Sequence, residues 1–229
     1  MQFNIITIFP QIFNSYFNES ILARAQKNKL VKINVHNLRD YTEDKHKTVD
    51  DTPYGGGAGM VFRVEPIYKA LVKIVGKSKL KCFRKKNNSK TKIILLSAKG
   101  KKFDQAMARK FSKLDNLILI CGRYEGVDER VMKYLADEEI SVGDYILTGG
   151  EIPAMTIVDS VSRLIKGVVG NKESIKEESF SKKYYLEYPH YTKPNVFSPN
   201  KKTNWKVPEV LLSGDHQKIK EWREKRSKF

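Results

Sequence analysis

Alternating apolar and polar positions along the chain predict a series of strands and helices. Residues 2–9 alternate and are rich in Ile and Phe, which is typical of a strand, and Pro10 then permits a helix to start. The pattern predicts further helices near 20–28, 65–75, 102–112, 127–136, 152–165 and 215–226, and further strands near 31–35, 92–97, 117–121 and 138–142. Strands and helices therefore alternate over most of the chain.

The central strands are continuous apolar runs. Such runs at 92–97 and 117–121 indicate strands buried on both faces, as in a parallel sheet covered by helices. Ligands of open α/β sheets bind at the carboxyl ends of the strands. Because small-residue loops follow the strands, we expect one ligand site at the loops 97–100, 122–126 and 143–150.

Three segments lack a regular pattern. Residues 40–60 become glycine-rich at Gly55-Gly56-Gly57-Ala58-Gly59 and predict a loop, which serves either as a tight turn or as a contact to substrate. The Lys-rich stretch 77–90 predicts an exposed excursion, and the polar stretch 171–183 predicts a linker. Aromatic residues return after 184, so a small second domain is expected there.

Composition excludes several classes of protein. With 229 residues, 40% of them hydrophobic, the chain can form a core and is not expected to be disordered. No apolar run approaches the roughly 20 residues of a membrane-spanning helix, and the first residues do not resemble a signal peptide. The two cysteines, Cys82 and Cys121, are too few for a disulfide framework. A cytoplasmic protein without a membrane partner is expected.

The charge is strongly positive and unevenly distributed. Lys and Arg number 43 and Asp and Glu 26, a net charge of +17. Residues 71–115 contain fifteen cations and two acids, whereas residues 121–160 contain three cations and nine acids. This distribution favours a nucleic-acid partner over a merely solvated lysine surface.

Familiar catalytic and cofactor motifs are missing. No Lys-Ser/Thr follows the glycine-rich loop, and Phe9-Pro10-Gln11 follows the first strand in place of Gly-x-Gly-x-x-Gly, so neither a P-loop nor a Rossmann site is predicted. The four histidines lack metal-ligand spacing, and no protein metal site is expected. No nucleophile elbow or Cys/His pair indicates covalent catalysis.

Long motifs in order nevertheless resemble one family. They are Thr48-Val49-Asp50-Asp51 with Pro53-Tyr54-Gly55-Gly56-Gly57, Gly122-Arg123-Tyr124-Glu125-Gly126, Val142-Gly143-Asp144-Tyr145-Ile146-Leu147-Thr148-Gly149-Gly150-Glu151, Pro153-Ala154-Met155-Thr156, Pro189-His190-Tyr191-Thr192-Lys193-Pro194 and Val210-Leu211-Leu212-Ser213-Gly214-Asp215-His216. With these motifs the chain resembles the TrmD family of bacterial tRNA (guanine-37-N1)-methyltransferases, of the SPOUT superfamily.

The resemblance implies a fold that periodicity does not reveal. It implies an α/β domain at 1–166 whose mostly parallel sheet ends in a deep trefoil knot that binds S-adenosylmethionine, a linker at 167–183, and a small helical tRNA-binding domain at 184–229. The implied cofactor-binding residues are Leu96, Ser97, Gly100, Gly122, Tyr124, Glu125, Val142, Gly143, Asp144, Tyr145, Ile146, Leu147, Gly149 and Gly150. Glycines suit this role because backbone groups can approach a ligand closely there.

The implied chemistry requires a base and a cation. Guanine N1 carries a proton that must leave before the nitrogen is nucleophilic, and a carboxylate can accept it. An Arg can stabilise the charge that develops on O6. The resemblance assigns these roles to Glu178 and Arg163, although this chain has Glu178-Ser179-Phe180 where the family pattern has Asp-Ser-Phe. The extra methylene moves the carboxylate by roughly 1–1.5 Å, and a misplacement of 1 Å can cost about 100-fold in rate.

The partners implied by the resemblance are tRNA with guanine at position 37 and a second copy of the chain in a homodimer with shared active sites. DNA is not expected as a partner. Candidate tRNA contacts are His46, Asp50, Ser174 and His190. Mg²⁺ is implied only by the resemblance, since no ligand cage for it stands out. The alternatives are a related methyltransferase acting on another nucleotide and an RNA-binding module without activity.

Overall fold

The computed structural model describes residues 1–77, 80, 90–170, 177–182 and 184–228. The chain divides into two compact units, Met1–Gly170 and Asn171–Phe229. Most of the expected excursion at 77–90 and about half of the expected linker at 171–183 lie outside the described residues.

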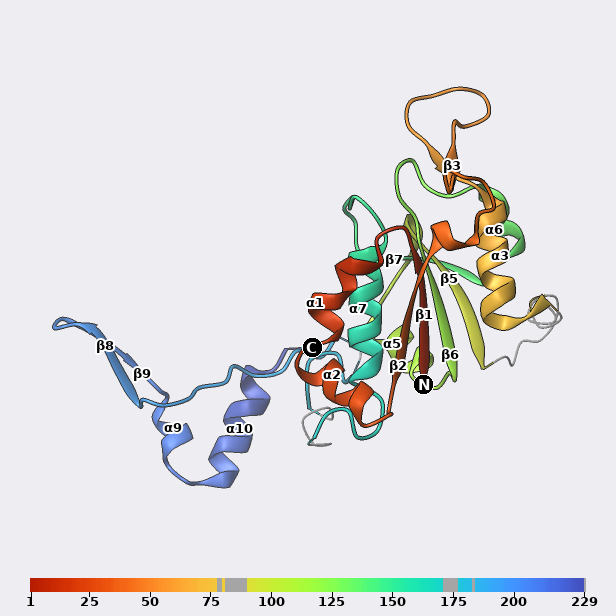
Figure 1. Ribbon diagram of the computed structural model, residues 1–229. Coiled ribbons are helices and arrows are strands. Elements are labelled where there is room, and N and C mark those ends of the chain that lie inside the picture. Colours follow the sequence, from red (N-terminus) through yellow and green to blue (C-terminus); the bar gives the residue numbers. More distant parts are fainter. Residues whose placement is uncertain (78–79, 81–89, 171–176, 183, 229) are drawn as a thin grey trace. The chain divides into compact units, whose positions relative to one another are not determined.

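A five-stranded parallel sheet forms the centre of the first unit (Figure 1). Its strand order is β2-β1-β6-β5-β7, so the first strand of the chain lies inside the sheet. The strands are β1 (Gln2–Thr7), β2 (Lys32–Asn37), β5 (Thr91–Lys102), β6 (Asn116–Cys121) and β7 (Glu138–Ser141). The α/β architecture with a parallel sheet, expected from the apolar runs, is confirmed.

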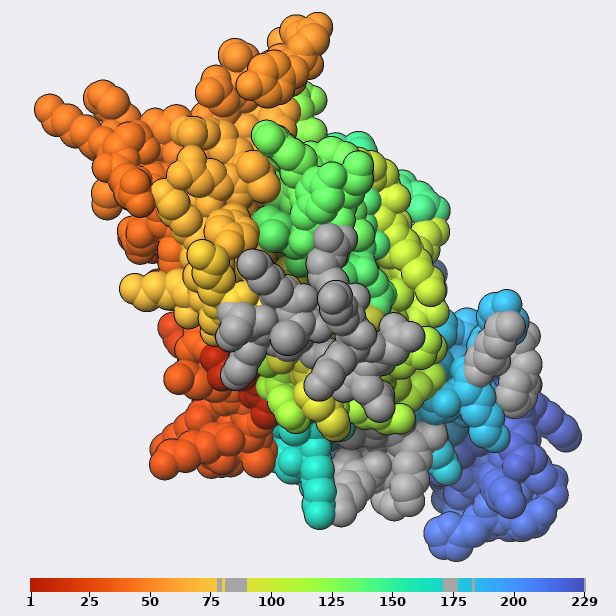
Figure 2. Space-filling model, turned by 90° about the vertical axis from the view of Figure 1, so that its right-hand side faces the viewer, coloured from red at the N-terminus to blue at the C-terminus, as the bar shows by residue number. Residues whose placement is uncertain are grey.

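Helices cover both faces of this sheet, because alternate side chains of each strand go to opposite faces. Phe3 and Leu119 belong to a core beneath α1 (Asn14–Phe17), α2 (Ser20–Lys27), α5 (Gln105–Phe111) and α7 (Glu151–Ser162). Ile6 and Ile118 belong to a second core beneath α3 (Val64–Val75) and α6 (Glu129–Tyr134). Figure 2 shows the outer surface of this second side, where the α3 and α6 segments lie next to each other.

Short elements complete the first unit. They are the 3-10 helices η1 (Pro10–Phe13) and η2 (Leu38–Tyr41) and the antiparallel pair β3 (Asp50–Asp51) and β4 (Val61–Phe62). The loop expected at 40–60 therefore contains one two-residue strand and the last residues of η2, and its glycines lie between β3 and β4.

The region after residue 97 differs from the expectation. A helix was expected from 102, but β5 extends to Lys102, and its register against β7 shifts between Leu96 and Lys101. Helix α5 begins only at Gln105, because the side chain of Asp104 caps it by accepting a hydrogen bond from the Met107 amide at 2.7 Å. The expected helix start was therefore wrong by three residues.

The second unit contains helices and a hairpin. Helices α9 (Glu209–Leu212) and α10 (His216–Arg226) bear out the expectation of a helical C-terminal region. The antiparallel strands β8 (Val196–Asn200) and β9 (Thr203–Lys206) were not expected. Pro199 lies within β8, and a proline removes a hydrogen-bond donor, so the sequence pattern there argues against a strand.

Candidate functional site

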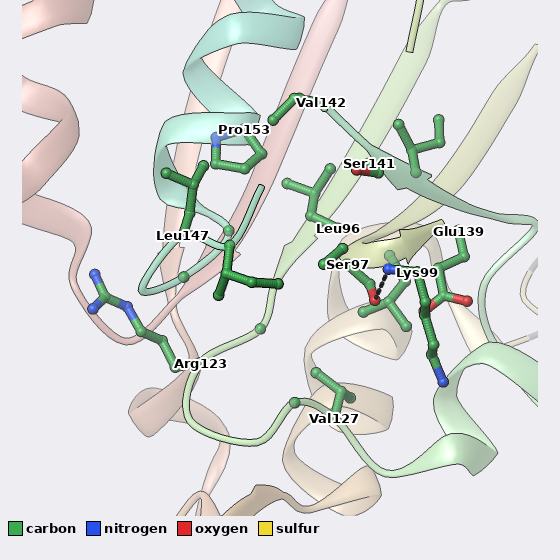
Figure 3. A pocket seen from close by; sticks show the side chains of 18 of the residues that line it. Leu96, Ser97, Lys99, Arg123, Val127, Glu139, Ser141, Val142, Leu147 and Pro153 are labelled. Atoms are coloured by element: carbon green, nitrogen blue, oxygen red, sulfur yellow. Dashed lines mark hydrogen bonds and ion pairs between the residues drawn. The ribbon is translucent and has the colours of Figure 1, made fainter. Parts of the chain in front are cut away.

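The part of β5 where its register against β7 shifts, together with the loops at the carboxyl ends of β6 and β7, surrounds a cavity of about 420 Å³ (Figure 3). This volume lies within the range of pockets that hold small organic ligands. Strand β5 contributes Leu96 to Lys99. The loop after β6, the second loop of the sequence prediction, contributes Gly122 to Val127, and the loop after β7, the third, contributes Ser141 to Gly143 and Tyr145 to Gly150. The three expected segments thus converge, but the segment 97–100, expected to be a loop, belongs to strand β5.

The second and third loops approach at backbone distance. A Cβ atom built on Gly150 would lie 2.6 Å from the Cα of Cys121, so no larger residue fits without a shift of the backbone. The Gly150 amide donates a hydrogen bond to the Gly122 carbonyl oxygen at 2.9 Å. Glycine at 150 therefore allows the start of α7 to lie against the end of β6.

A buried ion pair joins the same two loops. The Arg123 Nε donates to Glu151 Oε2 at 3.0 Å, and the Thr7 hydroxyl donates to Glu151 Oε1 at 2.8 Å. The Glu151 side chain is 2% exposed, and the Arg123 guanidinium lies over the Phe9 ring, 4.6 Å from its centroid. We name Thr7, Arg123 and Glu151 the clamp. It ties β1, the 122–127 loop and α7 together behind the cavity wall.

The clamp lies close to the buried Cys121 thiol. Burial raises the pKa of Cys121 well above its ordinary value, and the negative charge of Glu151 raises it further. The thiol is therefore protonated near neutral pH and is not a nucleophile.

The glycine-rich segment 55–59 packs against the 122–127 loop and does not line the cavity itself. A Cβ atom on Gly59 would lie 2.5 Å from the Glu125 side chain, and the Glu125 amide donates to the Met60 carbonyl oxygen at 3.1 Å. The Phe62 and Tyr124 rings meet edge to face at 5.8 Å. Gly55, Gly56, Gly57 and Gly59 all have positive φ, so this segment is at least a tight turn that supports the site.

Charged side chains line one side of the cavity. Lys99 Nζ lies 3.0 Å from Glu129 Oε2 and 4.0 Å from Glu139 Oε1. The hydrogen bond to Glu129 and the charge of Glu139 raise the pKa of Lys99. Glu139 Oε1 is buried and has no hydrogen-bond partner among the described residues. Since Lys99 is cationic at any physiological pH, it offsets part of the negative charge of this wall.

The structure brings most of the implied cofactor-binding residues together. Twelve of the fourteen line the cavity, and Gly100 and Asp144 do not. Gly100 lies against the backbone of β7, where a Cβ atom would be 2.4 Å from the Ile140 amide nitrogen. Asp144 forms an ion pair with Lys102.

The residues implied for catalysis and tRNA contact are divided between the two units. Arg163 is the C-cap residue of α7 in the first unit, whereas Glu178 belongs to the second unit. His46 and Asp50 lie in the first unit, His190 lies in the second, and Ser174 lies outside the described residues. Their roles stay predictions.

Sequence reasoning missed several residues of this site. It did not single out the clamp, nor Glu129 and Glu139 on the cavity wall. Glu151 and Arg123 stand within the glycine motifs, which is the only available signal, and the contact with Thr7 spans 144 positions of sequence. Within the described ranges, no three His, Cys, Asp or Glu side chains are grouped to hold a metal ion, and no helix is long and apolar enough to cross a membrane.

Comparison with known proteins identifies the family. A family model described as tRNA (Guanine-1)-methyltransferase TrmD matches residues 1–229. The chain is 53% identical to a tRNA (guanine-N(1)-)-methyltransferase of Carboxydothermus hydrogenoformans over 99% of its length and 83% of the relative. It is 48% identical to the Clostridioides difficile enzyme of the same description, over 99% of this chain and 92% of the relative. The chain therefore belongs to the TrmD family and is a tRNA guanine-N1 methyltransferase.

Proposed function

We propose that the chain transfers a methyl group from S-adenosylmethionine to N1 of guanine 37 in tRNA, and that the cavity at the ends of β5, β6 and β7 binds the methyl donor. The observation that carries the proposal is a cavity of about 420 Å³ at which Gly150 lies against the Cys121 backbone and Gly143 lies against the Tyr145 ring. Glycines along such loops let backbone groups come close to the flat, polar edge of an adenine ring. Ile146 and Leu147 supply apolar walls.

The proposed roles of the chain's own residues follow from the substrate. Bound S-adenosylmethionine supplies a methyl group on a positively charged sulfur. Glu178 accepts the N1 proton of guanine, and the Arg163 guanidinium stabilises the negative charge that moves to O6. Glu125 lines the cavity and offers a carboxylate to a cationic part of the donor.

We also propose that the chain around the cavity is knotted. The segment after β7 starts at the edge of the sheet and returns past β5, because the Gly149 and Gly150 backbones pair with Arg123 and Gly122 after β6. The family resemblance implies that a chain returning in this way is threaded as a trefoil knot. The domain limits that go with it are 1–166, 167–183 and 184–229, and the active enzyme is proposed to be a homodimer with shared sites.

The experiment is methylation of tRNA transcripts that differ only at position 37. We expect methyl transfer to a transcript with guanine 37 and none to one with adenine 37, and nuclease mapping should locate the methyl group on N1 of that guanine. If the methyl group is found on another nucleotide, guanine 37 is not the target of the enzyme. Binding of S-adenosylmethionine without any transfer would indicate an RNA-binding module that has lost activity.

A further inference from the structure

The β8–β9 hairpin of the second unit exposes all nine of its strand residues. Figure 1 shows that it projects beyond helices α9 and α10 of its own unit. A two-stranded hairpin without a covering layer is marginal in water, so an exposed one of this kind needs a partner or a function.

Two aromatic rings lie together on this hairpin. Phe197 and Trp205 are cross-strand partners, and their ring centroids are 5.6 Å apart. Phe197 is 50% exposed and Trp205 is 62% exposed. Their faces are therefore available for stacking with a flat ligand.

The charge of the hairpin is entirely positive. Residues 193–206 contain four lysines and no acid, the lysines being Lys193, Lys201, Lys202 and Lys206. Exposed aromatic rings surrounded by cations are the combination that proteins use for single-stranded nucleic acid, since the rings stack on bases and the cations contact phosphates. The lysines of the hairpin therefore make a polyanion its best electrostatic match.

We propose that the β8–β9 hairpin binds the unpaired nucleotides of the substrate's anticodon loop, with Phe197 and Trp205 stacking on bases and the lysines contacting phosphates. The inference rests on the proposed tRNA target and adds a surface and a mode of contact to it. Sequence-specific RNA recognition generally relies on unpaired bases of this kind. The hairpin thus acts in substrate capture and takes no part in methyl transfer.

The first test is binding of an anticodon stem-loop to full-length protein, followed by fluorescence anisotropy. We expect the double variant Phe197→Ala and Trp205→Ala to lose at least about tenfold in affinity, since base–aromatic stacking contributes roughly 1–3 kcal/mol per base. Trp205→Phe keeps a ring and should lose much less. Leu212→Ala is the matched control, because it truncates an exposed apolar residue on α9 of the same unit.

The second test separates stacking from charge. Lys201→Ala with Lys202→Ala should reduce the slope of log affinity against log salt by about 0.7 for each lost phosphate contact, whereas the double Arg variant should retain it. The parent and the double Phe197→Ala and Trp205→Ala variant should have the same affinity for a stem-loop whose loop nucleotides are abasic. Affinity for S-adenosylmethionine and the single-turnover rate at saturating tRNA should not change.

Two results would overturn the inference. One is parental affinity of the aromatic variant for the intact stem-loop. The other is a shift in sedimentation coefficient of the aromatic variant, which would show that the hairpin packs on a second copy of the chain. Failure of the proposed target is distinguishable, because then the parent itself would not methylate guanine 37.

Discussion

Single residues set the geometry of the cavity. Gly150 permits a backbone contact with Cys121, and Gly143 faces the ring of Tyr145, where a Cβ atom would be 2.2 Å from Cε1. Among these positions Gly150 is the most restrictive, because its neighbour is backbone and cannot rotate away.

Gly150→Ala is expected to weaken S-adenosylmethionine binding at least tenfold, because the added methyl group separates the second and third loops. Titration calorimetry on variants with a native circular dichroism spectrum measures this. Gly170→Ala is the matched control, since a Cβ atom there meets nothing within 4 Å. If Gly150→Ala binds S-adenosylmethionine as tightly as the parent, the cofactor does not bind at this edge of the sheet.

Glu178 carries a second prediction at this scale. Glu178→Gln keeps the shape and removes the base, so single-turnover methylation should fall by about 100-fold or more while cofactor affinity is retained. Glu178→Asp keeps the charge and should remain active. If Glu178→Gln is as fast as the parent, the base is another carboxylate, and Glu177 or Asp159 is tested next.

At the scale of elements, polar contacts fix how strands and helices meet. The clamp joins β1 to α7, and its Glu151 is buried. On the other face of the sheet, Asn4 of β1 bonds to Asn34 and His36 of β2 and to Asn116 of β6. Both sets satisfy buried polar groups, so losing one member leaves its partners unpaired.

Glu151→Gln should lower the free energy of unfolding by about 3 kcal/mol, because removal of one charge of a buried pair leaves the other uncompensated. Urea denaturation measures the change. Glu129→Gln breaks an ion pair whose partners are about 70% exposed, so its stability should change little. Equal effects of the two substitutions would show that the clamp is not a structural tie.

His36 predicts a pH dependence. Burial lowers its pKa, while Nε2 lies 3.0 Å from Asn4 Oδ1 and Nδ1 lies 3.1 Å from the Tyr41 hydroxyl. The unfolded chain therefore binds a proton more readily than the folded chain, and stability falls as the pH drops below about 6.5. As the pH is lowered from 8 to 5, the melting temperature of His36→Gln should decline less steeply than that of the parent. The same change at the exposed His46 should leave the decline as it is.

The sequence predicts an element well where neighbouring residues determine it, and poorly where distant parts of the chain do. The run at 117–121 identifies β6 almost to the residue, because burial on both faces leaves a continuous apolar pattern. The three glycine-containing segments 97–100, 122–126 and 143–150 are also local patterns, and most of their residues line the cavity, although the first lies within β5. The contact between Thr7 and Glu151 depends on the closure of the whole sheet, so no local pattern contains it. The β8–β9 hairpin lacks apolar alternation because it has no buried face.

At the scale of the whole molecule, the proposed catalytic pair is divided between the two units. Arg163 ends α7 in the first unit, and Glu178 belongs to the second. In the proposed homodimer, one active site can therefore combine residues of two chains.

A mixture of Arg163→Ala and Glu178→Gln chains tests this sharing. If the two residues reach one site from different subunits, mixed dimers contain one intact site, and an equal mixture should regain up to about a quarter of parental activity after random exchange. Sedimentation and differently tagged chains verify that mixed dimers form. Mixed dimers without activity would place both residues in one subunit.

The interior position of β1 has a consequence for the growing chain on the ribosome. β1 pairs with β6, so one of its edges has no partner until residues 116–121 have been synthesised. At about 5–20 residues per second, synthesis from the end of β1 to the end of β6 takes roughly 6–23 seconds, and long-range pairing of this kind is slow to form. The apolar β1 segment of the nascent chain can consequently bind chaperones or associate wrongly with other chains before the cavity has formed.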